Sequence, residues 1–174
     1  MIMKLNFYPE SDIQDYTGAV DFFQNIWKKE GNKIISKWEE ITNLKFYENE
    51  INVVVGNFRS QSHPLSLRFD NEDEIKKATL VHELGHRILY KRVKGMGMKS
   101  SLVRHKFLNL VLYDVFIELY GKDFTEKVIE WDATLGIENG QSLYKEAWDW
   151  ALQYKTKEER QKVFQKVLEE SLDL

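Results

Sequence analysis

The sequence predicts an α+β fold, in which a small N-terminal β-sheet packs on a helical half around one core. Three observations lead to this prediction. Short apolar runs with strand-like alternation, bounded by turn residues, occur only before residue 70. After residue 70, apolar residues recur at helical spacing. The 174 residues contain no linker, repeat or low-complexity segment, so we expect a single domain over residues 1–174.

The N-terminal segment predicts a strand followed by a long helix. Apolar and polar residues alternate over residues 2–8 well enough to predict a strand. Pro9 ends this strand, because proline has no N–H to donate to a neighbouring strand. The helix is expected from Ser11 onward, where large apolar residues recur at helical spacing. Gly31 is expected to break it, since glycine weakens a helix interior.

Two further strand regions follow. Residues 44–55 predict a strand pair joined by a turn at 48–50. Residues 65–69 predict a short strand, and Pro64 suits an edge position in the sheet. His63 precedes this strand and is expected to be an exposed loop residue.

A pair of helices joined by a short connector is expected next. The first begins near Asn71, which has the sequence pattern of a capping box. The connector covers residues 95–99. Ser100 or Ser101 caps the second helix, which runs to Gly121.

The rest of the chain is predicted to be helical. Asp123 with Glu126, and Thr156 with Glu159, have the spacing of capping boxes that open two further helices. Residues 141–154 lie between them and carry apolar side chains at helical spacing.

Composition excludes several classes of protein. The net charge of −3 gives no reason to expect nucleic-acid binding. The absence of cysteine excludes disulfides and thiolate metal sites, and it fits a reducing compartment. The apolar stretch at the N-terminus is too short for a signal peptide, because polar residues follow it too soon. No apolar run in the sequence is long enough to cross a membrane. We therefore expect a cytoplasmic protein with no membrane association.

The motif that organises the chain is H-E-x-x-H, formed by His82, Glu83 and His86. Residues four apart on a helix lie on one face, about one turn from each other. Two imidazoles at that spacing can bind one metal ion, and the intervening glutamate can reach a water molecule on it. Zn²⁺ suits imidazole nitrogen, and a third protein ligand would leave one position open.

The same residues also admit an explanation without a metal. Glu83 and Arg87 have the spacing of an i,i+4 ion pair, on a face that could simply be solvated. Against this, His82 and His86 lie on a stripe with apolar residues. Burying two imidazoles without polar partners is costly, and a shared metal ion meets that need.

The segment from Thr79 to Ile88 resembles the active-site helix of the zincin metallopeptidases. The positions that fit the longer zincin consensus are Thr79, Leu84, Gly85 and Ile88. Arg87 departs from it, because that position is usually uncharged. Nothing after the motif matches the third histidine of the metzincins. The chain resembles a minimal gluzincin-like peptidase, in which the third metal ligand comes from the next helix.

This resemblance implies zinc-dependent hydrolysis of peptide bonds. Zn²⁺ on His82, His86 and an acidic ligand from the next helix would lower the pKa of bound water and polarise the scissile carbonyl. Glu83 would take the proton of the water and pass it to the leaving amine. The peptide or protein substrate would pair with the edge strand predicted at 65–69. A cytoplasmic peptidase would also need narrow specificity or a regulatory protein partner.

The third metal ligand has three candidates, His105, Asp114 and Glu118. The two carboxylates lie in a nearly all-apolar run, so each needs a cation or a hydrogen-bond donor. In an antiparallel hairpin that turns near residue 98, residues whose numbers sum to about 196 lie level. Asp114 then lies opposite His82, whereas His105 falls more than one turn from His86. Asp114 is the predicted ligand, and Glu118 accepts a hydrogen bond from His82 or replaces Asp114.

Two rival functions remain open on the sequence. The chain could be a helical regulatory or interaction protein whose H-E-x-x-H motif is accidental or degenerate. It could also be a metal-dependent hydrolase of non-peptide amides. The oxyanion-stabilising residue stays open among His105, Arg104 and Tyr144.

Overall fold

A computed structural model describes residues 3–11, 15–90, 92, 99–138 and 140–172. The chain forms two compact units, one of Met1–Glu39 with Lys45–Ile88 and one of Glu40–Leu44 with Leu89–Leu174. Six helices and a small three-stranded parallel sheet occur in the described ranges, so the predicted α+β class is confirmed. The expectation of a single domain stays a prediction. None of the helices in these ranges is both long and apolar enough to cross a membrane.

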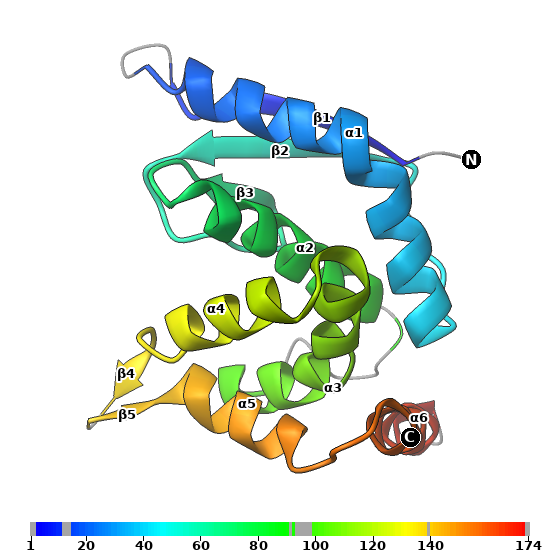
Figure 1. The fold of residues 1–174 in the computed structure, drawn as a ribbon. Coiled ribbons are helices and arrows are strands. Elements are labelled where there is room, and N and C mark those ends of the chain that lie inside the picture. The colour runs from blue at the N-terminus through cyan, green and yellow to red at the C-terminus, as the bar shows by residue number, and fades with distance from the viewer. Residues whose placement is uncertain (1–2, 12–14, 91, 93–98, 139, 173–174) are drawn as a thin grey trace. The chain divides into compact units, whose positions relative to one another are not determined.

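The first unit contains the sheet and two long helices (Figure 1). It contains β1 (Lys4–Pro9), β2 (Glu50–Gly56), β3 (Leu65–Arg68) and all but the last residues of α1 (Thr17–Thr42) and α2 (Asp73–Tyr90). The strand order is β1-β2-β3, and both pairs are parallel. The core of this unit includes Phe7 of β1, whose ring stacks on that of Phe23 of α1 with the ring centroids 6.1 Å apart.

The predicted break at Gly31 is wrong, because α1 runs through it without interruption. A Cβ atom at Gly31 would lie 2.8 Å from the ring of Trp27, four residues earlier. The glycine therefore gives the indole room to lie against the helix backbone. This contact explains a residue that costs the helix about 1 kcal/mol relative to alanine.

The predicted strand pair over residues 44–55 is only half correct. Residues 50–56 form β2, but residues 43–46 form no strand. Leu44 N donates to Thr42 Oγ1, and Phe46 N lies 3.4 Å from Glu39 Oε1, so these amides bond to side chains. β2 has β1 on one side and β3 on the other, which leaves no edge for a hairpin partner.

The strand predicted at 65–69 is confirmed as β3, at the edge of the sheet. Its outer edge is already used by the preceding loop. Ser66 and Gln61 exchange two backbone hydrogen bonds of 3.0 Å, and Arg68 N donates to Ser60 Oγ. His63 is exposed in that loop, as predicted.

The second unit is mainly helical. Its elements are α3 (Ser101–Tyr120), α4 (Lys122–Asp132), β4 (Ile137–Glu138), β5 (Gln141–Ser142), α5 (Leu143–Leu152) and α6 (Lys157–Leu172). The helix α3 contacts α4, α5 and α6, which explains why its side chains are mostly buried. The helix predicted over 141–154 is confirmed in α5.

The helix starts follow local chemistry where a side chain can reach the first turn. Ser100 caps α3 by accepting from Val103 N, as predicted. Thr156 and Glu159 form the predicted capping box, each side chain accepting from the other's backbone N–H at 3.1 Å. The box predicted at residues 123–126 is wrong, because α4 starts after Gly121 with no side-chain cap. The connector predicted at 95–99 lies, except for residue 99, outside the described residues.

Candidate metal site

The two histidines of the motif face each other across one turn of α2. His82 Nε2 and His86 Nε2 lie 3.1 Å apart, and their ring centroids are separated by 4.8 Å. Two nitrogens that bind one zinc ion at 2.0–2.1 Å in tetrahedral geometry would be about 3.3 Å apart. The two nitrogens are at hydrogen-bond distance, and this separation is also close to the one that a shared ion would require.

His105 lies on the first turns of α3 and is buried. Its Nδ1 is 2.7 Å from the carbonyl oxygen of Ser101, one turn earlier. A carbonyl can only accept a hydrogen bond, so Nδ1 carries a proton, and in the neutral ring the lone pair is then on Nε2. A backbone carbonyl commonly holds a metal-ligating histidine in this way.

The ring of Tyr144 fixes the other side of the His105 imidazole. The two rings meet edge to face with their centroids 4.6 Å apart. Gly136 makes room for this tyrosine, because a Cβ there would lie 2.9 Å from the Tyr144 ring. Gly136 also has a φ of +60°, which favours glycine. The Ser101 carbonyl and the Tyr144 ring thus both restrict the orientation of the His105 ring.

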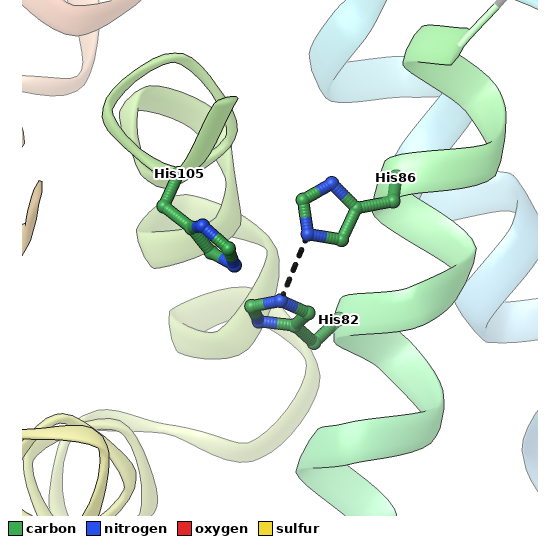
Figure 2. Close-up of side chains that lie close together, drawn as sticks. All are labelled: His82, His86 and His105. Carbon is green, nitrogen blue, oxygen red and sulfur yellow. Dashed lines mark hydrogen bonds between the residues drawn. The ribbon is translucent and has the colours of Figure 1, made fainter. Parts of the chain in front are cut away.

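His82, His86 and His105 form a group that could hold a metal ion (Figure 2). Each offers one ring nitrogen, and these nitrogens all lie within 4.8 Å of one another. Three neutral imidazoles with a fourth position left open are one of the donor sets of catalytic zinc. The donor chemistry therefore fits the zinc ion that the sequence predicts.

Asn109, one turn after His105 on α3, was not among the predicted site residues. It is 1% exposed, and neither atom of its amide has a hydrogen-bond partner among the described residues. Buried polar groups without a partner are rare in folded proteins. A buried polar group one turn from a metal-ligand candidate fits a site that holds a further group. The only sequence signal was an amide within an otherwise apolar run.

Asp114 lies in the second unit, in a buried ion pair. Arg160 of α6 donates from Nη2 to Asp114 Oδ1 at 2.6 Å and from Nε to Oδ2 at 3.1 Å. Arg160 also donates to the carbonyl of Tyr154 and lies over the ring of Tyr113. Both oxygens of Asp114 are thus engaged by a guanidinium, which supplies the cation that its apolar surroundings require.

Glu118 is likewise engaged within the second unit, where it forms an ion pair with Lys157 of α6. Neither Asp114 nor Glu118 belongs to the histidine group. Among the described residues, His105 is the one candidate for the third ligand that belongs to this group.

Glu83 and Arg87 are both buried, which argues against the purely solvated face. Arg87 donates from Nε to Glu48 Oε2 at 2.8 Å, and its two terminal nitrogens donate to Glu48 Oε1 and to the carbonyl of Ser62. Its charge is therefore balanced by Glu48, from the segment before β2. This pairing explains how the helix tolerates a cation at a position that zincins usually leave uncharged.

We compared the chain with protein-family models, curated proteins and solved structures, and none of them matched. The function of the chain is therefore inferred from the geometry of the histidines and of their neighbours.

Proposed function

We propose that this chain is a zinc-dependent peptidase whose metal is held by His82, His86 and His105. The observation that carries the proposal is the group of three ring nitrogens within 4.8 Å, two of them from an H-E-x-x-H helix. His105 takes the place that the sequence prediction gave to Asp114, because Arg160 engages both oxygens of that carboxylate.

The roles of the residues follow from their chemistry. A bound zinc ion would supply a Lewis acid that polarises the scissile carbonyl and makes water a nucleophile at neutral pH. The Glu83 carboxylate, next to His82 on α2, accepts the proton of the attacking water and passes it to the leaving amine. The carbonyl of Ser101 keeps His105 in the tautomer that ligates through Nε2. The substrate is a peptide or a protein.

The first test is the metal content of the purified protein, measured by elemental analysis after incubation with zinc and removal of excess. We expect about one zinc ion per chain, and its loss in His82→Ala, His86→Ala and His105→Ala. His63→Ala is the matched control, because His63 is exposed in a loop outside the group and should leave the stoichiometry unchanged. Wild-type protein that binds no metal would refute the proposal.

The second test separates catalysis from metal binding. Glu83→Gln should keep the zinc stoichiometry while losing about 10²–10⁴-fold in turnover. Turnover is measured by mass spectrometry on a peptide library and on a panel of non-peptide amides. Cleavage of the amides alone would identify a different hydrolase. Bound zinc without turnover of either substrate class would favour the regulatory protein.

A further inference from the structure

β1 is the edge strand of the sheet on the side away from β3. Its pairing with β2 uses alternate residues, as shown by Lys4 N donating to Asn49 O and Glu10 N donating to Val55 O. The N–H and C=O groups of Leu5 and Phe7 therefore point to the outer edge. Among the described residues, no backbone hydrogen bond outside the β1–β2 pair involves Leu5 or Phe7.

The two edges of the sheet thus differ. The outward N–H groups of β3 bond to its own loop, through Gln61 and Ser60. Natural proteins commonly protect sheet edges in such ways, because an open edge is a template for another strand. In the described part of the chain, no loop bonds to the outer edge of β1, so the outward groups of Leu5 and Phe7 stay open, while Pro9 offers no N–H there.

A cavity of about 360 Å³ lies along β1, and we call it the β1 groove. Its lining residues are Leu5, Asn6, Phe7, Tyr8, Gln24, Trp27 and Lys28. Successive side chains of a strand point to opposite faces, so four consecutive residues can line one cavity only along the edge of the strand. The wall comes from one turn of α1. The volume lies within the range of ligand-binding pockets.

The aromatic side chains of the groove are positioned to meet a ligand. Trp27 lies against Gly31, where any larger residue would displace its ring. Tyr8 is 49% exposed, so its ring is accessible to a ligand in the groove. Gly31 therefore has a function beyond the helix that contains it, because it sets the position of one wall of the groove.

We propose that the β1 groove binds an extended, acidic peptide segment of a partner protein, which adds to β1 as a further strand. The outward backbone groups of Leu5 and Phe7 would bond to the main chain of the peptide. Trp27 and Tyr8 would contact its side chains. Lys28 is the one charged residue among the described lining residues, so a carboxylate is the complementary charge. This site is independent of the proposed peptidase activity.

The test starts from a random heptapeptide phage library, panned on the full chain. Peptides that enrich are synthesised with a fluorophore, and their binding is measured by fluorescence polarisation with and without a metal chelator. We expect acidic, strand-forming sequences whose affinity falls by about tenfold or more in Trp27→Ala and in Lys28→Glu. Lys29→Glu is the matched control, because it makes the same charge change on the next residue, outside the groove, and should change affinity by less than about twofold.

Hydrogen exchange distinguishes strand addition from other binding. The amides of Leu5 and Phe7 should exchange more slowly in the complex, and peptides N-methylated at alternate positions should lose binding. The proposal would be overturned by peptides whose affinity is unchanged in Trp27→Ala and Lys28→Glu, or whose binding leaves the amides of Leu5 and Phe7 unprotected. A selection that enriches no peptide would overturn it as well. A dimer of this chain that Trp27→Ala dissociates would instead assign the groove to a second copy. Binding that persists in chelator keeps this result separate from the test of the peptidase.

Discussion

Asp114→Asn is the substitution that best separates a structural carboxylate from a metal ligand. Its partner Arg160 is buried, with side-chain exposures of 5% for the arginine and 6% for the aspartate. Removing one partner of such a pair costs about 3–5 kcal/mol, because the remaining charge stays buried without compensation. Asparagine keeps one oxygen acceptor, and a hydrogen bond to a charged group contributes about 1.5–3 kcal/mol. The difference between these two contributions gives an expected loss of about 2 kcal/mol in the free energy of unfolding.

The assay is urea unfolding followed by circular dichroism, carried out in chelator so that metal binding does not stabilise the native state. A loss of this size is smaller than the stability of typical domains, about 5–15 kcal/mol, so the variant should still fold. The zinc affinity of the folded variant should match that of the wild type. Glu118→Gln is the control on the same helix. Because its ion pair with Lys157 is about one-third exposed, it should cost less than about 1 kcal/mol.

The opposite result would refute the reasoning. If Asp114→Asn keeps its stability in chelator but loses zinc, the carboxylate is a ligand and the pair with Arg160 has no structural role. The double variant Asp114→Leu/Arg160→Met provides a further check, since it leaves no buried charge. It should be more stable than either single variant.

Three more predictions concern the fold. Burial raises the pKa of Asp132 to about 6, against a hydrogen bond from Trp148 that lowers it. Between about pH 4 and pH 6 the folded state thus holds a proton that the unfolded state has lost, so stability should fall as the pH rises. Asp132→Asn should remove this slope in urea titrations and be more stable at pH 7.5, by up to about 3 kcal/mol. Thr156→Ala should lower stability by about 1 kcal/mol in thermal unfolding, since it removes a helix cap. Gly31→Ala should fail to yield the usual gain of about 1 kcal/mol, because its methyl group meets Trp27.

The features that the sequence predicted correctly depend on neighbours within one or two turns. The i,i+4 spacing placed His82 and His86 on one face of a helix, and the structure confirms that they meet. The cap at Ser100 and the box of Thr156 with Glu159 are equally local. Such contacts follow from helix geometry and need no knowledge of the tertiary fold.

The strand predicted near residue 44 failed because pairing is not local. The alternation there was adequate for a strand, but a strand needs an unused edge to pair with. β2 uses both of its edges for β1 and β3, from distant parts of the sequence. The helix break predicted at Gly31 was wrong for a related reason, since the role of this glycine depends on where the Trp27 side chain lies.

Asp114 was predicted as a ligand because it should lie level with His82 on the neighbouring helix, and this prediction was made without the rest of the fold. The sequence established that a carboxylate in an apolar helix needs a cation or a donor, and that requirement is met. Counting residues along two helices could identify only partners within those helices, whereas the cation is Arg160, 46 residues later. Of the three candidates, only His105 belongs to the group with His82 and His86, and its hydrogen bond to the Ser101 carbonyl supports our proposal of it as the third ligand.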